Sequence, residues 1–170
     1  MAAGLVFTLL LGLSFGLWDG ADAGCRLRGT CFFYSPTALD CPLGWRWFNR
    51  RCFRVLNISK SWADAEKHCL QLDSHLASYH STGEYNFMRQ VIHLRTGKHT
   101  STWVGGYDSA QEGKWFWTDG SKFLFTNWRP ERPKNDGGVE HCMNINLNDK
   151  EFVGDADCVT QLPFICARPL

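Results

Sequence analysis

Apolar residues recur with helical spacing in two stretches near the middle of the chain. The first stretch follows Ser61, which can cap a helix, and it places four apolar residues on one face: Trp62, Ala65, Cys69 and Leu72. The second begins with the capping box of residues 81–84 and ends at Gly97, and its predicted buried stripe is Phe87, Met88, Val91 and Ile92. The pattern therefore predicts two amphipathic helices in succession.

The segments around these helices have the alternation and length of short strands. A hairpin is predicted where apolar residues flank a turn at residues 49–51, in which Arg50-Arg51 is interpreted as a solvated pair. After the second helix, strands are predicted at 102–104, 114–117, 142–147 and 164–167. Two helices followed by several strands indicate an α+β domain. Residues 119–140 show little regular pattern, and a loop of this length is usually functional or disordered.

The first residues have the features of an export signal. Leu5 to Leu17 is almost entirely apolar, is too short to span a bilayer comfortably, and precedes the small-residue cleavage site Ala21-Asp22-Ala23. We therefore expect a signal peptide at 1–23, a short extension at 24–40 and one domain at 41–170, in a secreted, extracellular protein with no stable membrane anchor. After loss of Asp19 and Asp22, 18 basic and 15 acidic residues remain, and this balance does not favour a nucleic-acid binder.

Cysteine usage also fits secretion. Eight cysteines follow the predicted signal: Cys25, Cys31, Cys41, Cys52, Cys69, Cys142, Cys158 and Cys166. An even number in an exported chain indicates disulfides, and the absence of CxxC or HExxH spacing argues against zinc. Asn57-Ile58-Ser59 is a glycosylation sequon. No nucleophile motif or paired-carboxylate pattern is present, so an enzyme is not expected.

Several motifs, taken in order, resemble the C-type lectin-like domain over residues 41–166. They are Cys-Pro-Leu-Gly-Trp from Cys41, the helix from Trp62 to Cys69, Leu76-Ala-Ser, Trp103-Val-Gly-Gly, Trp115-Phe-Trp-Thr-Asp-Gly-Ser, Asn127-Trp128 and the last three cysteines. Within that family the chain looks most like the secreted fish lectins of the ladderlectin and type II antifreeze group. The resemblance implies a disulfide-stapled α+β fold of two helices, short antiparallel strands and a long loop region.

The resemblance also implies three disulfides, Cys41–Cys52, Cys69–Cys166 and Cys142–Cys158. Cys25 and Cys31 are left over. They can pair with each other, which is the simplest interpretation, or link two chains, so the protein is expected to be a monomer or a disulfide-linked dimer.

Sugar-binding members of this family hold calcium with residues on both sides of a cis-proline, a downstream Glu and an Asn-Asp pair. By the resemblance, these positions are Arg132, Lys134, Glu140, Gly154 and Asp155 here. Only Glu140 and Asp155 keep the expected acid, and two positions carry cations that would repel a divalent ion. We therefore expect no cofactor and a degenerate calcium site, with calcium disfavoured.

Three alternatives for the long loop stay open. A displaced calcium site could use five oxygen-bearing residues, although such residues are also common in turns: Asn135, Asp136, Glu140, Asn148 and Asp149. Arg129, Arg132 and Lys134 could instead form a basic spot for a carboxylate, sulfate or phosphate, or simply be solvated charges. Trp128 could stack on a sugar, but the resemblance makes it packing beneath the site.

The sequence thus favours a binding module for extracellular or microbial-surface glycans that does not use the usual calcium site. Its candidate ligand-binding residues are Arg132, Lys134, Asn135, Glu140, Asp155 and Trp128. The partners would be glycans or cell-surface glycoconjugates. Two alternatives are an ice-binding protein of the type II antifreeze kind and a calcium-independent module that binds proteins. A charged loop with few threonines argues against ice.

Overall fold

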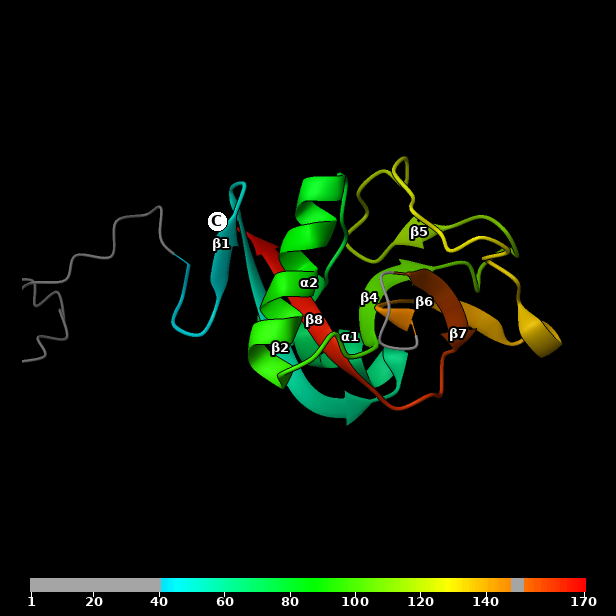
Figure 1. Cartoon of the computed structure of the whole chain (residues 1–170), viewed down its shortest axis with the longest axis horizontal. Helices are drawn as coiled ribbons and strands as arrows, with labels where there is room; N and C mark the ends of the chain where they lie inside the picture. The colour runs from blue at the N-terminus through cyan, green and yellow to red at the C-terminus, as the bar shows by residue number, and fades with distance from the viewer. Residues whose placement is uncertain (1–40, 148–151) are drawn as a thin grey trace, which may run out of the picture. The chain divides into compact units, whose positions relative to one another are not determined.

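The computed structural model describes residues 41–147 and 152–170 (Figure 1). The predicted signal peptide at 1–23, the extension at 24–40 with Cys25 and Cys31, and the loop residues Asn148 and Asp149 lie outside the described residues. The start of the domain at Cys41 therefore stays a prediction, as does the pairing of the first two cysteines.

Both predicted helices are present. Helix α1 (Trp62–Leu70) is capped by Ser61, and helix α2 (Thr82–Thr96) is capped by Ser81 and ends at Gly97, whose φ of 82° suits a residue without a side chain. The capping box is only half formed. The N–H of Glu84 donates to the Ser81 hydroxyl, but the Glu84 carboxylate accepts from the backbone N–H of His80 and not from that of Ser81.

The described strands form one sheet in the order β1-β2-β8-β4-β6-β7, with β3 added on β8 and β5 on β4. Their bounds are β1 (Arg46–Phe48), β2 (Arg51–Lys60), β3 (His75–Leu76), β4 (Thr102–Tyr107), β5 (Phe116–Trp117), β6 (Glu140–Ile145), β7 (Val153–Asp157) and β8 (Leu162–Pro169). All pairs are antiparallel except β4 with β8. The sequence pattern missed β3 and β7, which are short or carry polar residues.

Helix α2 covers β1 and β2, and the core lies between this helix and the sheet (Figure 1). The predicted stripe of α2 is confirmed for Met88, Val91 and Ile92, which are buried, while Phe87 is partly buried and stacks on Phe48. Helix α1 contributes to a second cluster, in which Ala65 and Cys69 are buried and Trp62 is partly buried. Leu72 packs against the same cluster from the turn after the helix ends at Leu70.

The three disulfides implied by the family resemblance are confirmed. They join Cys41 to Cys52, Cys69 to Cys166 and Cys142 to Cys158. The second links α1 to β8 across 97 positions of sequence, where the loop-entropy model gives roughly 4–5 kcal/mol of stabilisation. The third joins β6 to the end of β7, the two strands that carry the candidate site.

Gly105 shows why the Trp-Val-Gly-Gly strand needs a glycine. A Cβ at this position would lie 2.5 Å from the carbonyl oxygen of Leu76 and 2.7 Å from the hydroxyl of Thr118. The close approach brings β4 against the segment that follows β5, and the N–H of Thr118 donates to the carbonyl of Gly105. The base of the long loop is therefore held directly on the central strand.

Candidate functional site

The long loop runs from the end of β5 to the start of β6 and contains one short 3₁₀ turn, η1 (Asp136–Gly138). This confirms that residues 119–140 hold little regular structure. The Arg132–Pro133 peptide bond is cis, as the resemblance implied for this proline. Strands β6 and β7 pair antiparallel, and Glu140 at the beginning of β6 lies opposite Asp157, two residues after Asp155 on β7.

The guanidinium of Arg132 lies between the two acids that the family pattern retains. Its Nη1 donates to Glu140 Oε2 at 2.7 Å, to Asp155 Oδ1 at 2.8 Å and to the backbone oxygen of Asp155 at 3.1 Å. The side chain of Asp155 is fully buried, and those of Arg132 and Glu140 are each 18% exposed. A monovalent cation built into the chain thus occupies the coordinating oxygens that a calcium ion would need.

Backbone amides complete the coordination of the same carboxylates. The N–H groups of Lys134 and Asn135 both donate to Asp155 Oδ2 at 2.7 Å, and the N–H of Asp136 donates to Glu140 Oε2 at 2.9 Å. The Asn135 side chain accepts from the N–H of Glu140 at 3.0 Å. The loop from 132 to 140 is therefore folded around two carboxylates and one guanidinium, with every partner supplied by the chain.

The charges of this cluster reinforce one another. Burial acts to raise the pKa of Asp155, but hydrogen bonds from Arg132, Asn135 and Lys134 outweigh it and hold that pKa below its ordinary value. Burial acts to lower the pKa of Arg132, and its contacts with Asp155 and Glu140 overcome this and raise it. The ion pair is therefore fully charged at neutral pH.

The degenerate calcium site does not fit calcium. Arg132 and Lys134 stand at two ligand positions, Gly154 offers no side chain at a third, and the remaining acids already accept hydrogen bonds from Arg132. Calcium needs six to eight oxygens, and a guanidinium cannot supply one. The displaced site that would include Asn148 and Asp149 lies partly outside the described residues and stays a prediction.

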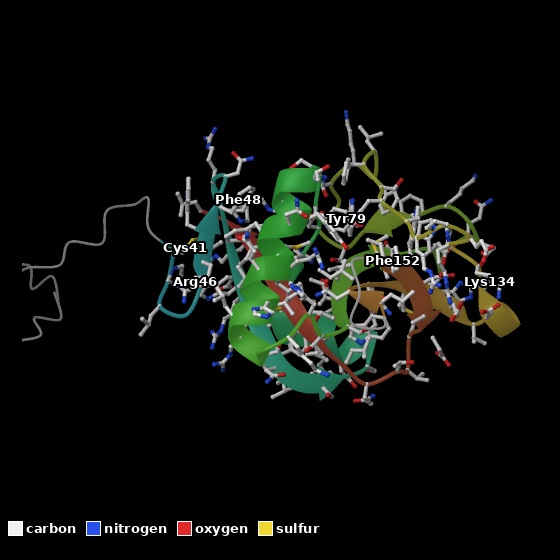
Figure 2. The ribbon with its side chains drawn as sticks, viewed as in Figure 1. Cys41, Arg46, Phe48, Tyr79, Lys134 and Phe152 are labelled. Atoms are coloured by element: carbon white, nitrogen blue, oxygen red, sulfur yellow. A yellow bond between two sulfur atoms is a disulfide. The ribbon has the colours of Figure 1, made fainter. Side chains whose placement is uncertain are left out.

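The three cations of the predicted basic spot, Arg129, Arg132 and Lys134, have different surroundings in the structure. Arg132 is engaged inside the loop, and Arg129 lies 5.3 Å from the ring centre of Phe152. Lys134 has 57% of its side chain accessible, and its Nζ lies 3.0 Å from a carboxylate oxygen of Asp136. Figure 2 shows Lys134 at the end of the domain away from Cys41.

Trp128 belongs to the packing beneath the loop. Its ring centre lies 4.7 Å from that of Trp115 in an edge-on arrangement, and its backbone bridges to Val153 on β7. Trp103, Trp115 and Trp117 are buried in the core. Trp128 is thus held by the core and is partly buried, as the resemblance implied.

A second polar cluster, which the sequence did not predict, lies beside the first. Asp108, Glu112 and His141 have potential metal-ligating atoms within 4.8 Å of one another, with Asp108 buried. His141 Nδ1 lies 3.1 Å from Asp108 and 3.4 Å from Glu112, while Glu112 also accepts from the side chain of Asn135. The group links the turn after β4 to the long loop, and it is the set of described residues best placed to hold a metal ion.

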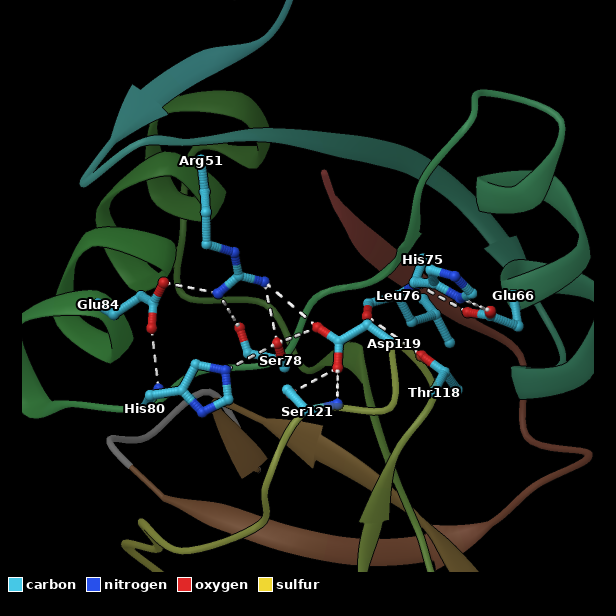
Figure 3. Close-up of polar contacts among 10 residues, drawn as sticks. All are labelled: Arg51, Glu66, His75, Leu76, Ser78, His80, Glu84, Thr118, Asp119 and Ser121. Carbon is cyan, nitrogen blue, oxygen red and sulfur yellow. Dashed lines mark hydrogen bonds and ion pairs between the residues drawn. The ribbon is translucent and has the colours of Figure 1, made fainter. Parts of the chain in front are cut away.

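A third network anchors the beginning of the loop (Figure 3). Arg51 Nη1 donates to Glu84 at 2.6 Å and to the backbone oxygen of Ser78 at 3.1 Å, while Nη2 lies 3.7 Å from Asp119. The interpretation of Arg51 as part of a solvated turn is therefore wrong: its side chain is 19% exposed because it faces Glu84 and Asp119. Burial acts to raise the pKa of Asp119, but hydrogen bonds from Ser121 and Ser78 and the charge of Arg51 bring it below its usual value.

The lectin C-type domain family matches residues 58–168. The chain belongs to the C-type lectin family. It is 42% identical over 124 residues to ladderlectin of Oncorhynchus mykiss, a match covering 73% of this chain and 65% of ladderlectin, slightly under two thirds of that protein's length. It is 36% identical over 164 residues to the galactose-specific lectin nattectin of Thalassophryne nattereri, covering 96% of each chain.

Solved structures agree with this membership of the C-type lectin family. The structure of herring type II antifreeze protein matches with a TM-score of 0.72 at 31% identity, covering 76% of this chain and 99% of that one. The resemblance and the fold class inferred from the sequence are therefore confirmed. No helix in the described part of this C-type lectin chain is long and apolar enough to cross a bilayer.

Proposed function

We propose that the chain is a secreted, extracellular binding protein that recognises glycans on cell or microbial surfaces without calcium. One observation carries the proposal: the Arg132 guanidinium bonds to both Glu140 and Asp155, the acids that would otherwise face a calcium ion. The loop is folded around this internal cation, so its binding face does not need a metal to form. The similarity to a galactose-specific lectin supports a glycan as the ligand.

The proposed contact surface is the exposed rim of the loop around the buried cluster. Lys134 and Asp136 are each more than half exposed, and Glu112 lies beside them with 56% of its side chain accessible. Such side chains can donate hydrogen bonds to sugar hydroxyls and accept hydrogen bonds from them, and these bonds would orient the sugar in place of a metal ion. Binding through hydrogen bonds and without catalysis is the chemistry that this surface supports.

Ice binding is the second candidate, because type-2 ice-structuring proteins of Osmerus mordax and Hemitripterus americanus are 33% and 31% identical to this chain. The charge of the rim argues against it. Lys134, Asp136 and Glu112 would keep their own hydration shells, whereas an ice-binding face works best when it is flat and weakly hydrated. Thermal hysteresis of the purified protein at millimolar concentration would overturn our preference.

A glycan array probed with EDTA and again with millimolar calcium tests the proposal. We expect the same bound glycans in both conditions, and we expect Lys134→Ala to weaken that binding while Lys122→Ala, an exposed lysine elsewhere in the loop, leaves it unchanged. Binding that disappears in EDTA would refute the metal-independent mechanism. Absence of any glycan signal would refute glycan recognition itself.

A further inference from the structure

A cavity at the other end of the domain is lined by three arginines. It has a volume of about 760 Å³ and lies between the segment that begins at Cys41, strand β2 and the second half of α2. Its basic residues are Arg46, Arg54 and Arg95. Figure 2 shows Arg46 beside Cys41, far from the labelled Lys134 of the long loop. This cavity is therefore separate from the loop surface of the proposed function.

The charges in this cavity are not neutralised by the described part of the chain. No Asp or Glu is among the described residues that line it, and none of the three guanidinium groups has an ion pair or side-chain hydrogen bond within residues 41–147 and 152–170. This contrasts with Arg51, which pairs with two acids, and with Arg132, which pairs with three. Three cations that line one cavity without counter-charges raise the local potential and attract an anion.

The rest of the lining sets the kind of anion. Trp45, Leu43 and Leu94 add apolar surface beside the arginines, and Leu43 and Leu94 are largely exposed. Guanidinium groups bind sulfate and carboxylate groups through paired hydrogen bonds, while apolar and aromatic side chains can contact the faces of sugar rings. The concave shape and volume fit a short oligosaccharide better than a flat bilayer surface.

The preceding segment does not supply the missing negative charge. Residues 24–40 contain Arg26 and Arg28 but only one acid, Asp40. Residues 24–40, which precede the lining residue Cys41 in the sequence, therefore have a net positive charge and cannot neutralise the three arginines. The ligand has to bring the negative charge itself.

We infer that the cavity lined by Arg46, Arg54 and Arg95 is a second binding site, which takes a sulfated oligosaccharide independently of the long loop. Such a site would let one chain hold one glycan at the long loop and a sulfated glycan at the other end of the domain. The sequon at Asn57 lies on the edge of the same cavity, so a glycan attached there would limit access to it.

The test measures binding of a heparin-derived hexasaccharide to the full chain by calorimetry. We compare Arg46→Gln/Arg54→Gln/Arg95→Gln with the control Lys67→Gln/Lys114→Gln/Lys122→Gln, which removes the same charge from exposed positions elsewhere. We expect the arginine variant to lose roughly tenfold or more in affinity and the control to change less than about twofold. Equal loss in both variants, or no binding by the unchanged protein, would overturn the inference.

Further arms separate the source of the anion and the two sites. The desulfated hexasaccharide should not bind. Vesicles of phosphatidylglycerol should bind no better than neutral vesicles. Preferential binding to the anionic vesicles that requires the three arginines would overturn the assignment to a sulfated glycan. Lys134→Ala should leave hexasaccharide affinity unchanged, so failure of the loop proposal and failure of this one give different results. Ser59→Ala removes the sequon without altering the lining, and we expect binding at least as strong.

Discussion

Replacement of Arg132 by Met tests the interpretation of the long loop directly. Glu140 Oε2 and Asp155 Oδ1 lie 2.7 and 2.8 Å from the same nitrogen, so the two oxygens can be no further apart than the sum of these distances. Two unit charges about 5 Å apart repel by roughly 3 kcal/mol at an effective dielectric constant of 20. Removing the cation also takes the guanidinium donor away from the buried Oδ1 of Asp155, although Glu140 Oε2 keeps the N–H of Asp136. Losing one partner of a buried ion pair costs about 3–5 kcal/mol.

The assay is thermal unfolding at pH 7 in EDTA. For a domain of this size, a loss of about 3 kcal/mol corresponds to a fall of roughly 10 °C in Tm. The control is Lys134→Met, which removes a neighbouring cation whose exposed pair with Asp136 is worth at most about 1 kcal/mol. A Tm for Arg132→Met within about 1 °C of that of Lys134→Met would refute the internal-cation reasoning.

A variant that supplies an oxygen in place of the guanidinium extends this test. Arg132→Gln leaves Glu140 and Asp155 without their cation and adds a carbonyl group, which is a ligand that calcium accepts. Millimolar calcium should therefore raise the Tm of Arg132→Gln, because a ligand that binds only the folded state stabilises it, while the unchanged protein should show no shift from this pair of acids. A calcium response of equal size in both proteins would place the ion elsewhere, for instance at the carboxylates of Asp108 and Glu112.

Two further predictions concern charge. In the folded protein the pKa values of Asp119 and Asp155 are held below their ordinary values. Both groups therefore stabilise the fold fully above their unfolded pKa of about 4, and they lose that contribution as the pH falls through the folded pKa. Urea unfolding from pH 7 to 2.5 should show constant stability down to about pH 5 and a steep fall below about 4, and a flat profile would contradict this. Arg51→Met should cost about 3 kcal/mol in the same assay, since Glu84 is left buried and unpaired, whereas Arg50→Met should change little because its side chain is exposed.

The helices could be predicted from the sequence because their signals are local. Ser61 and Ser81 mark the N-termini, Gly97 marks the end of α2, and the apolar spacing between them matches the buried faces. The disulfides could not have been derived from spacing alone, since eight cysteines allow about 105 pairings. They came from the family resemblance, which the described pairs confirm.

Side-chain direction in the loops was beyond the sequence. The sequence led to a solvated charge for Arg51, and for Arg132 it left both a basic ligand-binding spot and a solvated charge open. What decides their direction is non-local: Glu84 on α2 faces Arg51, and Asp155 on β7 faces Arg132. The cluster at His141 was missed for the same reason, because its two acids come from the turn after β4, about thirty positions earlier in the chain.

The difference between a bound ion and a covalently attached cation has consequences for recognition. A calcium ion carries two charges, can leave when calcium is scarce or the pH falls, and can share its coordination sphere with a sugar. The guanidinium of Arg132 carries one charge and is always present. Its Nη1 donates hydrogen bonds to both Glu140 and Asp155. A loop held in this way gains independence from the concentration of calcium but gives up direct metal–sugar coordination. Under the proposed function, a ligand of this face is bound by groups at its rim, and Lys134 is the first residue to test.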